Sequence, residues 1–327
     1  MRRRDFIRLV GGAAVAWPLT TPAQPASPVV GYLGNASSEL SANAVRAFRE
    51  GLSEIGYVEG RNVTIKYRWA DGQNNQLPAL AADLVGRQVS VIAAPGSTPA
   101  ALAAKAATAT IPVVFQIGSD PVAAELVGSL ARPGGNVTGV ASMNTELGPK
   151  RLELLRELIP TAKIIALLVN PTSPFITENI SKDLQSATRT LGLQLHILNA
   201  SSEHDFDTVF AALVQLRADA LVIAPDALFI NRREQLGALT LRHAVPAIAQ
   251  FREFAAAGGL MSYGGSFMEG ARQVGVLTGR ILKGEKPADL PVQQSTKVEL
   301  IVNQKTAKAL GISVPQALIS RADEVIE

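Results

Sequence analysis

The chain has 327 residues, of which 47% are hydrophobic and 18% are charged, and its formal net charge is +3. This length favours two domains, each with a core of its own. The chain contains no cysteine, which excludes disulfides, thiol nucleophiles, cysteine metal sites and a lipid anchor attached through cysteine.

The first 23 residues have the pattern of an export signal. The basic stretch Arg2–Arg4 precedes a short apolar run, and Thr21-Pro22-Ala23 offers small residues before a cleavage point. Arg3-Arg4-Asp5-Phe6-Ile7 is similar to a twin-arginine signal, which exports folded proteins. A basic amphipathic helix is the alternative, since the apolar run is too short to span a bilayer. We expect residues 1–23 to be removed and the mature protein to be soluble and free in the periplasm.

The excess of positive charge lies in this segment. Its removal takes away four arginines and one aspartate, so the mature chain carries no net charge. No basic cluster remains that would attract nucleic acid or an anionic membrane. We therefore expect no nucleic-acid partner.

Strands alternate with helices through the first half of the mature chain. At 40–55, for example, Val45, Phe48, Leu52 and Ile55 recur at helical spacing. Short apolar runs that end in small polar turns, with helices between them, are typical of a parallel α/β sheet. The expected strands are 28–35, 62–69, 91–94 and 112–115, and the expected helices are 40–55, 77–85 and 100–109. We place the first crossing to a second lobe at 137–143.

The second half repeats this alternation and then returns to the first lobe. The expected strands are 164–170, 194–198, 220–224, 246–249 and 297–303, and the expected helices are 150–158, one that ends at 191, 206–216, 228–242, 267–282 and 306–310. The second and third crossings are expected at 258–264 and at the proline-rich linker 286–291. Lobe 1 would then comprise 28–141 and 262–288, and lobe 2 would comprise 142–261 and 289–327. Three crossings would form a hinge.

Three segments of the first half recur in the second half in the same order and at a nearly constant offset. The pairs are Gly31–Asn35 with Ala166–Asn170, Val91–Gly96 with Leu221–Asp226, and Ile111–Gln116 with Val245–Gln250. Matches in register suggest two half-chains of similar architecture. Because ligands bind beyond the carboxyl ends of parallel strands, two such lobes would place their binding loops on opposite sides of a cleft.

Several longer segments carry a resemblance to a known family. They are Gly31-Tyr32-Leu33, Ala131–Gly139 (ARPGGNVTG), Glu253–Gly264 (EFAAAGGLMSYG) and Lys283–Val292 (KGEKPADLPV). The chain resembles the ABC-transporter substrate-binding protein family typified by tryptophan-binding proteins, over essentially the whole mature chain. The resemblance implies a type I periplasmic-binding fold with two Rossmann-like α/β lobes. It also implies a monomeric receptor that closes on a small ligand and delivers it to a membrane permease.

Candidate binding residues in lobe 1 follow three of the predicted strands. In similar proteins hydroxyls and amides at helix N-termini hold an α-carboxylate, which suits the unpaired N–H groups and the dipole of a helix start. Ser97, Thr98 and Ser119 occupy such turns, although each is equally suited to capping a helix. Asp120 would repel a carboxylate and would instead cap its own helix or take an amine. Asn35 follows the first strand, where it would reach polar groups of the ligand, although Asn is also simply common in turns.

In lobe 2, Asp226 follows a strand at the position where lobe 1 has Gly96, so the turn itself does not require an acid. It would pair with a ligand ammonium, or cap the next helix. Asn170 matches Asn35 and carries the same two interpretations. Aromatic side chains at strand ends more often serve packing than line a pocket. The remaining candidates for the pocket wall are Ser173, Phe175, Phe229, Phe251 and Tyr263.

The sequence thus predicts an exported, non-catalytic receptor for a carboxylate-bearing ligand such as an amino acid or an aromatic acid, with no cofactor and no metal. The three histidines have no metal-ligand spacing, and neither Gly-x-Gly-x-x-Gly nor Gly-x-Ser-x-Gly occurs in a suitable place. A ligand-sensing subunit of a signalling system and an exported α/β hydrolase are the alternatives.

Overall fold

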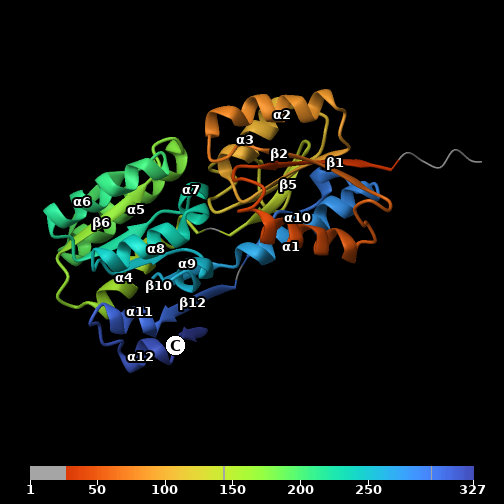
Figure 1. Cartoon of the computed structure of the whole chain (residues 1–327). Coiled ribbons are helices and arrows are strands. Elements are labelled where there is room, and N and C mark those ends of the chain that lie inside the picture. Colours follow the sequence, from red (N-terminus) through yellow and green to blue (C-terminus); the bar gives the residue numbers. More distant parts are fainter. Residues whose placement is uncertain (1–26, 143, 296) are drawn as a thin grey trace, which may run out of the picture.

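The computed structural model describes residues 27–142, 144–295 and 297–327. The predicted signal at 1–23 lies outside this part of the chain. Two α/β lobes lie side by side, and each is built on a single sheet (Figure 1). None of the helices in the described ranges is both long and apolar enough to cross a membrane.

Lobe 1 contains a six-stranded sheet in the order β11-β5-β4-β3-β1-β2, with all neighbouring strands parallel. Its strands are β1 (Val29–Gly34), β2 (Thr64–Trp69), β3 (Val91–Pro95), β4 (Val113–Ile117), β5 (Val137–Ala141) and β11 (Gln293–Gln294). Its helices are α1 (Ala42–Glu54), α2 (Leu77–Gly86), α3 (Thr98–Ala107) and α10 (Phe267–Leu282), with short 3-10 turns η1 (Asn74–Gln76) and η3 (Pro287–Asp289).

Lobe 2 contains a seven-stranded sheet in the order β13-β12-β10-β9-β8-β6-β7, parallel except where β12 meets β10. Its strands are β6 (Ile164–Val169), β7 (Gln194–Asn199), β8 (Ala220–Ile223), β9 (Ala247–Ala249), β10 (Met261–Gly265), β12 (Val298–Asn303) and β13 (Glu324–Ile326). Its helices are α4 (Gly148–Leu158), α5 (Pro174–Leu191), α6 (Phe206–Leu216), α7 (Ala227–Asn231), α8 (Arg233–Arg242), α9 (Arg252–Ala256), α11 (Gln304–Ala309) and α12 (Gln316–Ile319), with η2 at Glu203–Asp205.

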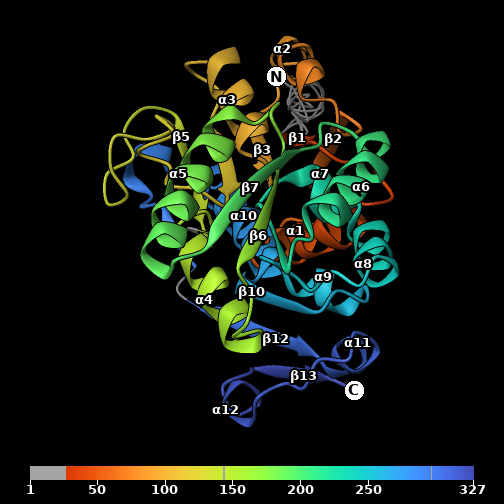
Figure 2. The same ribbon diagram turned by 90° about the vertical axis from the view of Figure 1, so that its left-hand side faces the viewer.

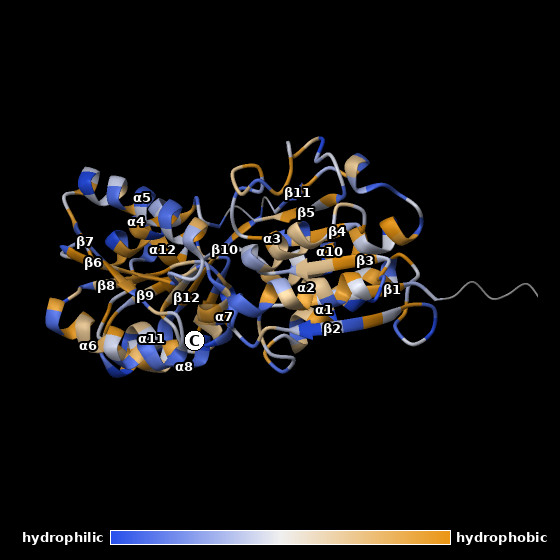
Figure 3. Ribbon diagram, turned by 90° about the horizontal axis from the view of Figure 1, so that it is seen from above, coloured by the Kyte–Doolittle hydropathy of each residue, from blue (hydrophilic) through white to orange (hydrophobic). Residues whose placement is uncertain are grey.

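The predicted repeat is confirmed by the order of the strands. Five strands of lobe 1, β5-β4-β3-β1-β2, correspond one by one to β10-β9-β8-β6-β7 of lobe 2. The central strands of both sheets are mainly hydrophobic, whereas most of the helices mix hydrophobic and hydrophilic residues (Figure 3). Every residue of β3 and β4 is buried, as expected for central strands covered by helices on both faces.

The sheets correct several of the boundaries expected from the sequence. Residues 261–265 form β10 inside lobe 2, so the crossing predicted at 258–264 and the return to lobe 1 at 262 are wrong. Residues 293–294 pair with β5, so this part of the C-terminal segment belongs to lobe 1. The segment predicted as the first crossing begins with β5. The lobe to which each segment belongs depends on the distant strand with which it pairs, and local composition does not reveal that strand.

The helix predicted at 228–242 is two helices, because the chain breaks at Arg232 between α7 and α8. The short elements α9, α12, β11 and β13 were not expected. In contrast, α6 and α10 begin and end at the predicted residues, since both have a long apolar face.

The three crossings between the lobes lie together. The Asn144 side chain accepts a hydrogen bond from the Gly265 N–H at 3.0 Å and donates one to the Ser142 hydroxyl at 3.0 Å. A Cβ atom at Gly265 would lie 3.2 Å from Ser295 Oγ, so the second and third crossings are also adjacent. The hinge is therefore a compact bundle of three segments, which favours rotation of one lobe against the other.

A buried arginine lies beside this hinge. Arg151 of α4 is fully buried, and its Nε donates to the Tyr263 carbonyl at 2.8 Å. Burial lowers the pKa of its guanidinium to about 9. The contact fixes α4, the first helix after the crossing, to β10, the last strand before the chain returns.

Candidate functional site

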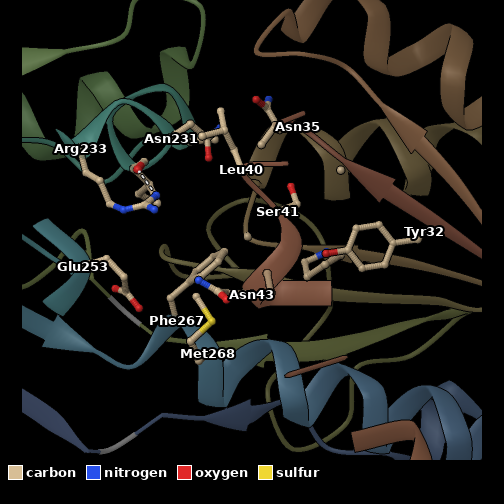
Figure 4. A pocket seen from close by; sticks show the side chains of 17 residues that line it. Tyr32, Asn35, Leu40, Ser41, Asn43, Asn231, Arg233, Glu253, Phe267 and Met268 are labelled. Atoms are coloured by element: carbon tan, nitrogen blue, oxygen red, sulfur yellow. Dashed lines mark hydrogen bonds between the residues drawn. The ribbon is translucent and has the colours of Figure 1, made fainter. Parts of the chain in front are cut away.

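A pocket with a cavity volume of about 50 Å³ lies between the lobes, at the carboxyl ends of β1 and β3 (Figure 4). This is where parallel α/β sheets bind ligands. Its wall on lobe 1 consists of Tyr32, Gly34, Asn35, Ala36, Leu40, Ser41, Asn43, Ala44, Pro95, Gly96, Phe267 and Met268, and its wall on lobe 2 consists of Ala227, Ile230, Asn231, Arg233 and Glu253.

The lobe 1 wall is largely apolar and aromatic. Gly96 has a φ of +81°, and a Cβ atom there would lie 2.5 Å from the Phe267 ring. Glycine at this turn therefore lets the first residue of α10 close one side of the pocket. Burial raises the pKa of the Tyr32 hydroxyl above its ordinary value, so this side chain remains a neutral phenol at physiological pH.

The lobe 2 wall brings two opposite charges to the pocket. Arg233 and Glu253 both extend toward it from lobe 2 (Figure 4). Arg233 Nη1 donates to the Ile230 carbonyl at 3.2 Å, and Arg233 Nη2 lies 3.8 Å from Glu234 Oε1. Sequence analysis missed both residues. The only available signal was a charged side chain soon after a strand end, which is too common to single out a site.

The predicted lobe 1 residues meet at the N-terminus of α3. Ser97 Oγ accepts a hydrogen bond from the Ala100 N–H at 3.2 Å, which makes it the N-cap. The Thr98 and Ser119 hydroxyls lie 3.2 Å apart, and both residues are buried. Asp120 accepts from the Val122 N–H at 2.8 Å and so closes its own turn. The Thr98 and Ser119 hydroxyls are thus adjacent at the N-terminus of α3. Ser97, Thr98 and Ser119 are not among the residues that line the pocket, but Gly96, which precedes Ser97, is.

The predicted polar residues of lobe 2 also form a cluster, centred on Asp226. Its carboxylate accepts from Asn170 Nδ2 at 2.9 Å, from Ser173 Oγ at 2.7 Å and from the Leu228 N–H at 2.9 Å. Asp226 is buried, and this burial raises the pKa of its carboxyl despite the three donors. The side chain therefore caps α7 and also joins two strand-end loops, and its neighbour Ala227 lines the pocket.

A chain of hydrogen bonds connects the two lobes. Asn35 of lobe 1 donates to Asn74 Oδ1 in η1. Asn74 Nδ2 then lies within hydrogen-bond distance of Thr172 Oγ1 (3.0 Å), the Thr172 carbonyl (3.3 Å) and Ser173 Oγ (3.4 Å) of lobe 2. Asn74 was not a predicted site residue. It precedes a helix, as Asn often does, and its partners are 98 and 99 residues away in the sequence.

The predicted aromatic residues take different places. Phe175, in α5 of lobe 2, packs against the hydrophobic core of lobe 1. Phe251 is buried and its ring centroid lies 5.3 Å from that of Phe267, so it contacts a residue of the pocket wall. Phe229 is buried in the core of lobe 2. Tyr263 lies in β10 and packs against the same core.

Known proteins share this architecture. A tyrosine-binding protein of Clostridioides difficile (strain R20291) is 29% identical over 270 residues, which are 82% of this chain and 76% of that protein. The ABC domain from Streptococcus pneumonia, solved in complex with L-Trp, is 25% identical, with a TM-score of 0.82 over 92% of this chain and 100% of that one. The ligand-free, open structure of a substrate binding protein with adhesive properties from Clostridium difficile is 26% identical, with a TM-score of 0.62 over 91% of this chain and 99% of that one.

The last two comparisons differ in how closely the whole structure matches this chain. Both proteins are about equally similar to this chain in sequence, yet the TM-score is much higher for the L-Trp complex. The structure of this chain as a whole is therefore more similar to the L-Trp complex than to the open, ligand-free structure.

The fold and the sequence lead to the same family. Solved periplasmic binding proteins of low sequence identity share the two-lobed fold, which is that of type I periplasmic binding proteins. A sequence profile for the ABC transporter substrate binding protein family matches residues 37–326. Members of that family bind ligands for transport rather than catalyse a reaction. The chain belongs to the ABC transporter substrate binding protein family.

Proposed function

We propose that this chain is the exported receptor of an ABC importer and that its lobes close on a free amino acid with an aromatic side chain. The observation that carries the proposal is the pocket between the lobes. Its wall includes Gly96, which precedes the Ser97 and Thr98 hydroxyls, and Ala227, which follows the buried Asp226. The tyrosine-binding relative and the structural neighbour with L-Trp support the class of ligand.

The two polar clusters suit the two charges of an amino acid. Ser97 and Thr98 stand at the N-terminus of α3, where hydroxyls and free N–H groups favour a carboxylate. Asp226 provides the acid for an ammonium group, and the ligand would replace one of its present donors, Asn170 or Ser173. A zwitterion would thus be held by both lobes at once, and this differential contact is what stabilises closure.

The pocket itself suits an aromatic side chain with a polar edge. Its lobe 1 wall includes the rings of Tyr32 and Phe267 and the flexible side chain of Met268. Glu253 could accept a hydrogen bond from a phenol or an indole N–H. The cavity is smaller than such a side chain, so the lobes or the Met268 side chain would have to move when the ligand enters.

Export and delivery follow from the same proposal. The predicted twin-arginine signal would direct the folded receptor to the periplasm, where closure would present a joint surface of both lobes to the permease. Cell fractionation of the full chain and of a variant with Arg3→Lys and Arg4→Lys would test the signal. Loss of the protein from the periplasm in the variant is the expected result, and unchanged export would contradict it.

The ligand is tested by calorimetric titration of the chain from residue 24 with the twenty amino acids, indole-3-propionate and tryptamine. We expect binding of tryptophan or tyrosine with micromolar or lower Kd, and at least about tenfold weaker binding of each analogue, because each lacks one charged group that is worth about 1.5–3 kcal/mol. Equal binding of the analogues would contradict the proposed clusters. Lack of binding to any amino acid by folded protein would contradict the ligand class.

A further inference from the structure

We infer that Asn74 is the positioning residue that couples the two half-sites: it holds the Asp226 cluster of lobe 2 against the pocket wall of lobe 1 and so stabilises the closed arrangement. This inference goes beyond the proposed function and rests on it only for the effect on ligand binding. Its effect on the lobes themselves is independent of which ligand is bound.

The first step is the position of Asn74 between the two walls. On one side its Oδ1 accepts from Asn35, which lines the pocket. On the other side its Nδ2 reaches Thr172 Oγ1 at 3.0 Å and Ser173 Oγ at 3.4 Å. The side-chain amide of Asn74 therefore accepts a hydrogen bond from a residue of lobe 1 and donates to residues of lobe 2.

The second step leads from Asn74 to the proposed ammonium site. Thr172 Oγ1 donates to Asn170 Oδ1 at 2.8 Å, and Ser173 Oγ donates to Asp226 Oδ2 at 2.7 Å. Asn170 Nδ2 completes the circuit with Asp226 Oδ1 at 2.9 Å. Both residues that Asn74 contacts in lobe 2 are thus fixed directly to the Asp226 cluster, and no ligand atom is needed for the connection.

The third step is that these bonds join the two lobes in this structure. Asn74 belongs to lobe 1 and Thr172 to lobe 2, so rotation about the hinge would separate them. They lie near two other contacts between the lobes. Phe175 packs on the lobe 1 core, and a Cβ atom at Gly118 would lie 3.8 Å from Pro225 Cβ. Of these contacts, only Asn74 is directional and connected to polar groups of the site.

Removing a contact that forms only in the closed state should raise the rate of ligand dissociation and leave the rate of ligand association unchanged. A ligand that binds an open receptor enters before the contact forms, but it leaves only after the contact has broken. We expect Asn74→Ala to raise the ligand dissociation rate about three- to tenfold, with the association rate within about twofold of the wild type. Asn74→Asp should act similarly, because a carboxylate cannot donate to Thr172 or Ser173.

The matched control is the adjacent Asn75, which is exposed. Asn75→Ala removes the same side chain from the same short turn and should leave both rates unchanged. A double-mutant cycle of Asn74→Ala and Thr172→Val tests the hydrogen bond between these two residues. The effect of Asn74→Ala on the dissociation rate should be smaller when Thr172→Val is also present. Stopped-flow measurements with tryptophan or tyrosine, whichever binds, provide the rates.

A measurement without ligand keeps this inference separate from the proposed function. The chain has no cysteine, so dyes can be placed at Ala79→Cys in lobe 1 and Ser186→Cys in lobe 2, both exposed. Single-molecule energy transfer should show a smaller closed fraction for Asn74→Ala than for the wild type and Asn75→Ala. Equal closed fractions in all three proteins, or equal dissociation rates, would overturn the inference. Failure of the wild type to bind amino acids would overturn the proposed function alone.

Discussion

At the scale of single residues, the polar side chains around the cleft have two functions that only variants can separate. Ser97 caps a helix and Asp226 both caps a helix and joins two loops. The sequence could place these residues at strand ends, because the turn chemistry there is local. It could not identify Asn74, Arg233 or Glu253, whose relevance depends on the opposite lobe.

Two substitutions of Ser97 can distinguish its effect on helix stability from its effect on ligand binding. Ser97→Ala removes the acceptor for the Ala100 N–H and should lower the free energy of unfolding by about 1 kcal/mol, whereas Ser97→Gly should cost only a few tenths of a kcal/mol, roughly. If the hydroxyl binds the ligand carboxylate, both variants lose amino-acid affinity to a similar extent, about fivefold or more. Denaturant unfolding and calorimetry give the two quantities. Undiminished affinity in Ser97→Gly would leave capping as its only function.

Asp226→Asn should separate ligand binding from stability. The amide keeps the shape of the side chain but loses the charge that would pair with an ammonium group, so affinity should fall about tenfold or more. Binding of indole-3-propionate, which has no ammonium, should change little. The exposed Asp207→Asn in α6 is a control for the loss of one negative charge. Equal losses for tryptophan and indole-3-propionate would argue against an ammonium site.

The same variant should change how stability depends on pH. Burial raises the pKa of Asp226 in the folded protein, so above the ordinary value of about 4 the unfolded chain ionises first. The free energy of unfolding of the wild type therefore falls as pH rises from the ordinary pKa to the raised one. Asp226→Asn lacks this fall, so its Tm relative to the wild type should increase from pH 4 to pH 7. A pH-independent Tm difference would contradict the raised pKa.

At the scale of elements, α1 and α10 hold the two distant segments of lobe 1 together. They pack through glycine: a Cβ atom at Gly51 would lie 1.9 Å from the Arg272 carbonyl oxygen, and one at Gly275 would lie 2.1 Å from the Phe48 carbonyl oxygen. The sequence predicted both helices from their apolar faces. It did not predict their contact, because a glycine inside a helix has no local signature of a partner.

This packing predicts that a glycine-to-alanine substitution has opposite effects at closely packed and at open positions of a helix. Gly275→Ala or Gly51→Ala should lower the free energy of unfolding by about 1–3 kcal/mol, because the helices must move apart. Gly86→Ala, where a Cβ atom meets nothing within 4 Å, should raise it by about 0.5–1 kcal/mol. Thermal and urea unfolding measure these differences. Equal effects in α2 and α10 would contradict the close approach.

At the scale of the whole molecule, contact between the lobes gives some residues positions that differ from those expected of the isolated lobes. Figure 2, which looks at the molecule from the lobe 2 side, shows lobe 2 in front of lobe 1. Phe175 was predicted to line the pocket, whereas it packs against the core of lobe 1. A partly buried side chain of one lobe that packs against the other favours contact between the lobes for every ligand alike.

Phe175→Ala should therefore weaken all ligands by the same factor. A ligand that needs the closed state loses affinity in proportion to the closed fraction, and loss of this aromatic contact should cost about tenfold. Calorimetry with tryptophan, tyrosine and phenylalanine would measure the three factors. A loss confined to one of these ligands would instead make Phe175 a wall of the binding site. Phe229→Leu, which repacks only the lobe 2 core, is the control.

The sequence by itself determined most of the local elements, a repeat of three segments and the family, because apolar periodicity, turn residues and family segments are all contained in short stretches of chain. It also placed Asn35, Ser97, Thr98, Ser119, Asn170, Ser173 and Asp226 at the ends of strands. Only the tertiary structure decided that β10 belongs to lobe 2, that Asp226 is surrounded by donors and that Asn74 meets Thr172. Each of these depends on which distant residues come together, and that is fixed by the packing of whole sheets and lobes.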